Sequence, residues 1–301
     1  MVITEVKDLG RSWTSLFLWP YKAFRFAQRF PILAGLVLTL LAVGAIFSSY
    51  LSSYDPGRRV LRDREIPPFW VAEGTFEHPL GTDHLGRDVF SRILYGARIS
   101  LMVAGIAVVI GVLAGTATGL IAGYFGGWVD EILMRAVDLW LALPFLLLVL
   151  VVAVTTDPSV LVVIILLAVS SWSTGARNIR GEVLSLKTLE YVDLARVAGA
   201  NHWRIVVRHL LPQVFHIVIV ITTLRTGQLI IAEAGLSFLG VGVPSSIPTW
   251  GIMISEGQRY LLTSWWIAIL PGVAIFLTVM AFNFLGDWMR DHFDPRLRQV
   301  G

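Results

Sequence analysis

The sequence lacks cysteine and has little charge. Without cysteine, no disulfide framework, thiol nucleophile or thiolate metal site can form in these 301 residues. Charged residues make up only 15% of the chain, against about 25% in soluble domains. The net charge of +3 is too small to indicate nucleic-acid binding. This composition excludes a water-soluble enzyme, a disordered regulator and a DNA-binding protein.

The motifs of common catalytic sites are also missing. Lysine occurs only at Lys7, Lys22 and Lys187 and never follows a glycine, so the chain has no P-loop for ATP. The six histidines are scattered without metal-ligand spacing. The segment GLSFLG at 235–240 has no glycine two residues after its serine, as a nucleophile elbow requires. We therefore predict that the chain is not an enzyme and binds no metal or cofactor itself.

Long apolar runs dominate what is present. Hydrophobic residues reach 55% and the mean hydropathy is +0.72. A membrane-spanning helix needs about 20 mostly apolar residues. Six segments meet or approach this length: 31–50, 100–123, 139–154, 160–176, 213–232 and 266–285. We therefore expect an all-α membrane protein with six transmembrane helices.

The distribution of basic residues predicts the orientation. With the N-terminus inside, the inner segments hold 15 Lys and Arg residues and the outer segments hold 8. Because basic residues favour the cytoplasmic side, both termini are expected in the cytoplasm. The first apolar run is too long, and its charged leader too extended, for a cleaved signal peptide.

This topology divides the chain into regions. Residues 1–30 interleave aromatic and basic residues, as in a helix lying in the headgroup region; a membrane-proximal tail with ordinary aromatic anchoring fits equally well. The remaining regions are the anchor helix 31–51, an extracytoplasmic loop 52–99, a five-helix core 100–285 with a cytoplasmic loop 177–212, and a cytoplasmic tail 286–301.

Two features lie within the predicted spans. The second span carries glycines at a four-residue spacing, which leaves one helix face bare for close packing: Gly111, Gly115, Gly119 and Gly123. The fifth span contains Arg225, and a charge at that depth usually faces a cavity or a partner. Arg225 is therefore either a lining residue of a polar pathway, together with Glu233, or a structural cation paired with Glu233 or a neighbouring subunit.

The cytoplasmic loop contains YVDLARVAGANHWRIVVRHLLP at 191–212. Gly199 is expected to separate a first short helix from a second one that ends at Pro212. Such a knob could dock on another protein or rest on the bilayer as an amphipathic loop. It resembles the EAA signature of ABC importer membrane subunits, with Asp193 for Glu, Leu194 and Ala195 for the two alanines, and then Gly199, Leu211 and Pro212. His209 stands where that signature has Ile.

Four more segments resemble one family, the dipeptide/oligopeptide/nickel ABC-transporter permeases, in their second (C-type) membrane subunit. They are HPLGTDHLGRDVFSRILYGARISL at 78–101, GLIAGYFGGWVDEILMRAVDLWLALP at 119–144, EAGLSFLGVGVPSSIPTWGIMISEG at 233–257 and FNFLGDWMRDHFDPRLR at 282–298. The family usually has prolines where Ser245 and Ser246 stand here. The resemblance covers nearly the whole chain after about residue 30.

This resemblance implies a type I ABC importer permease fold in the plasma membrane of a prokaryote. The implied partners are a second homologous permease, two ATPase subunits that use ATP and Mg, an extracytoplasmic substrate-binding protein and the lipid bilayer, with no nucleic acid. Substrates of such systems are dipeptides, longer peptides, nickel or, in some lineages, sugars, and peptides are the expectation here. The alternatives are a stand-alone ion-coupled carrier or channel and, more distantly, a membrane-embedded enzyme.

The resemblance also assigns roles to residues. It implies that the loop at 191–212 contacts the ATPase through Asp193, Leu194, Ala195, Arg196, Gly199, Ala200, Asn201 and Arg204. The outer-loop motif comprises Gly81, Thr82, Asp83, Gly86, Arg87 and Asp88. We interpret it as a structured cap that meets the binding protein or the partner permease, or else as a plug whose charged residues satisfy each other.

Overall fold

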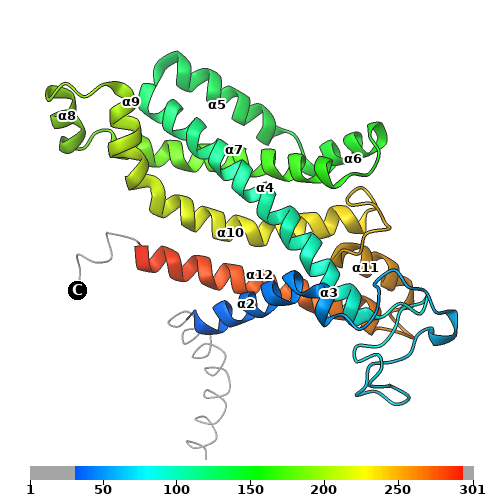
Figure 1. The fold of residues 1–301 in the computed structure, drawn as a ribbon. Helices are drawn as coiled ribbons and strands as arrows, with labels where there is room; N and C mark the ends of the chain where they lie inside the picture. The colour runs from blue at the N-terminus through cyan, green and yellow to red at the C-terminus, as the bar shows by residue number, and fades with distance from the viewer. Residues whose placement is uncertain (1–30, 294–301) are drawn as a thin grey trace, which may run out of the picture.

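The computed structural model describes residues 31–293, and this part of the chain is helical without a β-strand (Figure 1). The expected interfacial segment 1–30 and the last residues of the tail lie outside the described range. The elements in chain order are α2 (Ile32–Ile46), α3 (Ser48–Leu51), η1 (Leu61–Asp63), α4 (Val89–Phe125), α5 (Gly127–Ala142), α6 (Phe145–Thr155), α7 (Val160–Leu186), α8 (Glu190–Val197), α9 (His202–Ile205), η2 (Val206–Leu210), α10 (Leu211–Phe238), α11 (Trp250–Gly257), η3 (Gln258–Tyr260) and α12 (Trp266–Phe293).

Four helical stretches are long and apolar enough to cross a bilayer: α4, α7, α12 and the continuous run His202–Phe238. All four extend past the predicted ends of their apolar segments. Helix α4 starts at Val89 instead of residue 100, and α12 continues to Phe293 instead of ending at 285. At about 1.5 Å per residue, the 37 residues of α4 measure about 55 Å, well beyond the roughly 30 Å hydrocarbon core.

The predicted third span, 139–154, is not one straight helix. The chain breaks after Ala142, and α5 and α6 meet at 81° across Leu143 and Pro144. Proline cannot donate a backbone hydrogen bond and restricts the residue before it to extended conformations. Leu143 accordingly has a ψ of 127°. The bent pair counts as a fifth candidate span, and α2, with 15 residues, is shorter than the other candidates.

The four-residue glycine repeat of α4 lies against α7. A Cβ atom on Gly115 would stand 2.8 Å from the carbonyl oxygen of Trp172, and one on Gly119 would stand 2.7 Å from that of Ala176. Gly111 and Gly123 face α7 in the same way. Because the glycines carry no side chains, the two backbones approach closely, and this pair forms the centre of the bundle (Figure 1).

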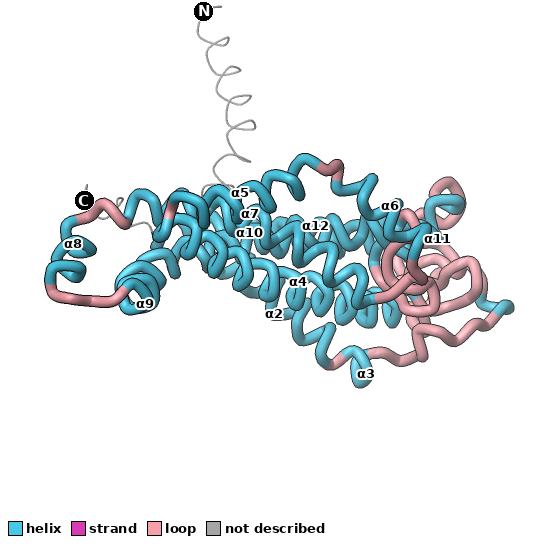
Figure 2. The backbone as a smooth tube through the Cα atoms, turned by 90° about the horizontal axis from the view of Figure 1, so that it is seen from above, coloured by secondary structure: helices cyan, strands magenta, loops and turns pink. Residues whose placement is uncertain are grey.

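Two buried clusters stabilise opposite parts of the molecule. The larger one joins α4, α7, α10, α11 and α12 and includes Val103, Leu167, Ile230 and Trp250. The smaller one lies where α4 and α7 end and α8 and α9 begin. Figures 1 and 2 show α8 and α9 at one end of the bundle and the loop before α4, together with α11, at the other.

Much of the predicted cytoplasmic loop 177–212 is helical. Residues 177–186 continue α7 as helix, and the second short helix does not end at Pro212. Instead, α9 passes through a π-helical turn, η2, directly into α10. Pro212 has no N–H to give to the carbonyl four residues earlier, and the wider π-turn just before it shifts that hydrogen-bond pattern.

Candidate functional site

The first candidate site is the knob, which we define as residues 190–207: α8, the turn at Gly199, α9 and the first residues of η2. Gly199 ends α8 with a φ of +78°. Its N–H donates to Arg196 O, and the N–H of Ala200 donates to Ala195 O, both at 3.0 Å. This is a Schellman cap, for which glycine is the preferred residue. Asn201 then caps α9 by accepting the N–H of Arg204 at 2.8 Å.

A buried root attaches the knob to the bundle. Val192 and Ile205 are fully covered and pack with Leu120 of α4 and with Ile179 and Val183 of α7. Two polar contacts strengthen this junction. The hydroxyl of Tyr124 lies 2.9 Å from Nδ1 of His202, and Nζ of Lys187 donates to Gly123 O at 2.8 Å.

The outward face of the knob is apolar, which is unusual for a surface loop. Leu194 is 68% exposed and Val197 is 87% exposed. Trp203 and Val207 continue this exposed surface on α9 and η2. Charged residues border it: Arg196 donates to Asp193 at 2.8 Å, and Arg204 is exposed. Exposed apolar side chains with a polar rim are typical of a protein-docking surface.

The second candidate site is an ion network at the other end, which we call the outer cluster. Asp83 accepts from Nε of Arg87 and from Nη1 of Arg92, both at 2.6 Å. Both arginines also donate to Glu256 of α11 at 2.7 Å. Burial opposes ionisation of Asp83, but the two guanidinium groups and the N–H groups of Arg87 and Leu85 outweigh it, so its pKa lies below the ordinary value.

The rest of the outer-loop motif shapes this cap. Asp88 caps α4 by accepting the N–H of Ser91 at 2.7 Å and lies 2.9 Å from Nδ1 of His78. Gly81 and Gly86 have positive φ values of 79° and 73°. The carbonyl of Thr82 accepts from the indole of Trp266 at 3.0 Å, which joins the loop to α12. Asp83 and Arg87 thus pair within the motif, whereas Asp88 contacts Ser91 and His78 instead.

The third candidate site surrounds Arg225, and the proposed pair with Glu233 is wrong. Arg225 donates from Nη1 to Gln228 Oε1 at 2.7 Å and from Nη2 to Ser170 O at 2.8 Å. Glu233 is fully buried and accepts from Ser237 at 2.8 Å. The two side chains are eight residues apart, about 80° around the helix, and point to different surroundings.

Polar residues from three helices share the surface next to Arg225, and we call this the polar face. On α7, Ser170, Thr174 and Arg177 recur at helical spacing and so lie on one side. Arg177 pairs with Asp138 of α5, and the two side chains are 57% and 59% exposed. On α10, Gln228 is exposed beside Arg225. Such groups are too costly to place in lipid, so protein or water must cover this face.

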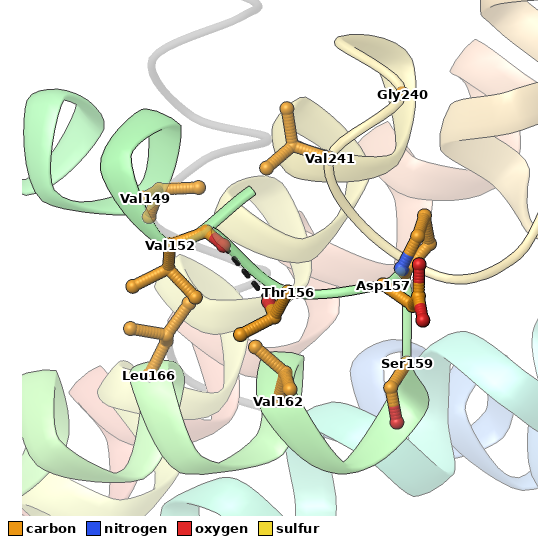
Figure 3. A pocket seen from close by; sticks show the side chains of 10 residues that line it. Val149, Val152, Thr156, Asp157, Ser159, Val162, Leu166, Gly240 and Val241 are labelled. Atoms are coloured by element: carbon orange, nitrogen blue, oxygen red, sulfur yellow. Dashed lines mark hydrogen bonds between the residues drawn. The ribbon is translucent and has the colours of Figure 1, made fainter. Parts of the chain in front are cut away.

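Cavities of about 30 to 270 Å³ occur in the described part of the chain. The one in Figure 3 lies between the α6–α7 turn and the segment after α10, and its space of about 30 Å³ is the share of one water molecule. Its walls are mixed: Val149, Val152, Val162 and Leu166 lie opposite the polar residues Thr156, Asp157 and Ser159 (Figure 3). A second cavity of about 170 Å³ lies at the α5–α6 bend, and Ser170 forms part of its wall. Residues 31–293 contain no group of His, Asp and Glu able to hold a metal ion.

Three residues of these sites were not predicted from the sequence. Arg92 and Glu256 complete the outer cluster, and Ser170 supplies the acceptor for Arg225. Arg92 and Glu256 are 164 residues apart, so no local pattern joins them. Their positions inside the resembling segments 78–101 and 233–257 were the only available signal.

The sequence of this chain is similar to membrane components of known transport systems. A model of the binding-protein-dependent transport system inner membrane component family matches residues 107–299. The glutathione transport system permease protein GsiD of Pectobacterium atrosepticum is 42% identical, over 93% of this chain and 92% of its own length. The dipeptide permease DppC of Bacillus subtilis is 40% identical, over 89% and 82% respectively. The oligopeptide permease OppC of the same species is 37% identical, over 95% and 92%.

These matches confirm the resemblance drawn from the motifs. The match to the family model covers more than half of the chain, and each of the three relatives is aligned over most of its own length. Together with the long apolar helices, they establish a multi-pass helical membrane protein. The chain belongs to the family of binding-protein-dependent transport system inner membrane components.

Proposed function

We propose that the chain is one of two permease subunits of an ATP-binding-cassette importer for di- or oligopeptides in the inner membrane of a prokaryote. The relatives named for dipeptide, oligopeptide and glutathione transport support peptides over nickel or sugars. A second homologous permease would cover the polar face, and an extracytoplasmic binding protein would deliver the substrate. Two separate ATPase subunits would use ATP and Mg.

The knob is the observation that carries this proposal. It exposes Leu194, Val197 and Trp203 at one end of the bundle, while its root fixes it to α4 and α7. An isolated channel or carrier has no need for an apolar docking surface of this kind. In our proposal an ATPase cleft accepts the knob, with Asp193, Arg196 and Arg204 at its charged rim and with Ala195, Gly199, Ala200 and Asn201 setting the turn.

The proposed topology has six spans and cytoplasmic termini. Helix α2 would be the first span and the bent pair α5–α6 the third. The knob end would face the cytoplasm and the outer cluster the opposite side, in agreement with the excess of basic residues in the inner segments. The outer-loop motif would then form a rigid cap to which the binding protein or the second permease docks.

The test is a charge placed on the apolar surface of the knob. We expect L194D and V197D to abolish co-purification of the ATPase subunits and peptide uptake in cells that express the whole importer. Both side chains are exposed, so the permease itself should still fold, which its amount in the membrane checks. A charge in the centre of an apolar interface loses its hydration without gaining a partner.

L262D is the matched control, because Leu262 is a fully exposed leucine. It lies between η3 and α12, just after α11, which Figure 1 shows at the opposite end of the bundle from the knob. This variant should retain the ATPase subunits. If L194D and V197D also retain them and transport at the wild-type rate, the knob does not couple to an ATPase. A chain that transports alone after purification, without a second permease, would instead establish the carrier or channel alternative.

A further inference from the structure

Arg225 lies near the middle of α10, a candidate membrane span, and has no counter-charge among the described residues. It follows Leu211 by 14 residues and precedes Phe238 by 13 in α10, which puts it about 20 Å from either end. Its acceptors, Gln228 Oε1 and Ser170 O, are neutral. No carboxylate within residues 31–293 forms an ion pair with Arg225. Glu233 accepts a hydrogen bond from Ser237, and Asp138 pairs with Arg177.

The guanidinium also keeps hydrogen-bonding capacity. Each terminal nitrogen of an arginine carries two N–H groups, and Nη1 of Arg225 uses one of them, on Gln228. Gln228 is exposed, so this part of α10 opens onto the polar face. A planar cation with spare donors is the preferred partner of a carboxylate.

The surroundings of Arg225 suit the C-terminal residue of a peptide. The cavity of about 170 Å³ at the α5–α6 bend is lined by Ser170 together with Trp140, Phe145 and Leu148. Ser170 therefore connects the guanidinium to an apolar hollow of roughly side-chain size. Every unmodified peptide has one carboxylate at its C-terminus, whatever its sequence, and that charge has to cross the hydrocarbon layer.

We propose that Arg225 binds the C-terminal carboxylate of the peptide during its passage along the polar face. This inference rests on the proposed function as a peptide permease. The cation offsets the loss of hydration of the carboxylate in the middle of the membrane, and the adjoining cavity accepts the last side chain. Because each peptide has this group, a single arginine serves substrates of many sequences.

The experiment uses the complete importer, reconstituted in proteoliposomes with its binding protein. Uptake of a tripeptide is compared with uptake of its C-terminal amide, each at a concentration that calorimetry shows to saturate the binding protein. We expect R225Q to lower the maximal uptake of the free acid by at least about tenfold. The amide should be transported slowly, and at the same rate, by the wild type and by R225Q. R225K should retain part of the preference for the acid.

Other outcomes would overturn the inference. A carboxylate of the second permease is the other source of a counter-charge, and in that case R225Q would lower acid and amide uptake equally or release the second permease during purification. R135Q, which removes an exposed arginine of α5 paired with Glu131, is the matched control and should keep the wild-type preference. A wild-type importer that transports neither peptide would contradict the proposed function itself.

Discussion

Asp83 shows how a single residue holds the outer end of the chain together. Its carboxylate receives two guanidinium groups and two backbone N–H groups, and it is almost completely buried. Arg92 belongs to α4, and Glu256, which shares both arginines, belongs to α11. The network thus ties a loop to two helices that are distant in sequence.

We predict that D83N lowers the free energy of unfolding at neutral pH by about 3 kcal/mol, since removing one partner leaves buried charges undercompensated. The lower end of the usual range applies because Glu256 still accepts from both arginines. Thermal unfolding in detergent measures the effect. D63N is the control, because Asp63 contributes only its backbone carbonyl to the cap.

The stability difference between wild type and D83N should depend on pH. The pKa of Asp83 is lowered in the folded state, so its ionised form stabilises the fold above the unfolded value of about 3.9. This stabilisation is lost as the pH falls through the folded pKa. The stability difference between wild type and D83N should therefore narrow only below about pH 4. A difference that already disappears near pH 6 would assign the effect to another group.

At the scale of elements, the contact of α4 with α7 depends on the absence of side chains. We predict that G115V lowers the free energy of unfolding by about 1–3 kcal/mol, because the added side-chain atoms overlap the backbone of Trp172 and Ala176. G105V lies on the same helix at a position where a Cβ meets nothing within 4 Å. This control should change the melting temperature little. Equal losses in both variants would mean that valine in α4, and not its contact with α7, causes the effect.

The sequence predicted the helices well and their ends poorly. Apolar runs locate the spans because the bilayer demands about 20 apolar residues, yet α4, α7 and α10 extend beyond those runs into polar sequence. The bend at Pro144 was missed because LALPFLLLVL reads as one apolar segment. The continuity of α9 with α10 was missed because proline usually begins or breaks a helix, whereas here a π-turn precedes it.

For the candidate sites, too, features with a local sequence pattern were predicted and contacts between distant segments were missed. The two short helices around Gly199 could be predicted because their pattern is local, and Arg225 stood out as a single charge in an apolar run. Partners from other helices, such as Ser170 for Arg225 and Glu256 for Arg87, depend on tertiary packing. The pair of Arg225 with Glu233 was wrong because about two turns of one helix do not bring a buried and a half-exposed side chain to the same face.

For the whole molecule, the absence of cysteine makes the proposed topology directly measurable. V197C on the knob and L262C at the opposite end would each be the sole thiol of the chain, and both positions are exposed. We predict that, in spheroplasts that express the permease without its ATPase subunits, a membrane-impermeant maleimide labels L262C and labels V197C only after the membrane is opened. Labelling of V197C in sealed spheroplasts would contradict the orientation with cytoplasmic termini.

The unbroken run from α9 to α10 has a mechanical consequence. His202–Phe238 is one unbroken helical run of 37 residues, in which α9 turns away from α10 at η2 (Figures 1 and 2). Helix α10 itself is about 42 Å long and carries Arg225 at its middle. A tilt of α10 by about 5° around that middle would displace each of its ends by roughly 2 Å while hardly moving the backbone of Arg225. The π-turn at η2 is the place where this run bends. Arg225 would then act as a nearly stationary pivot while the two ends move in opposite directions.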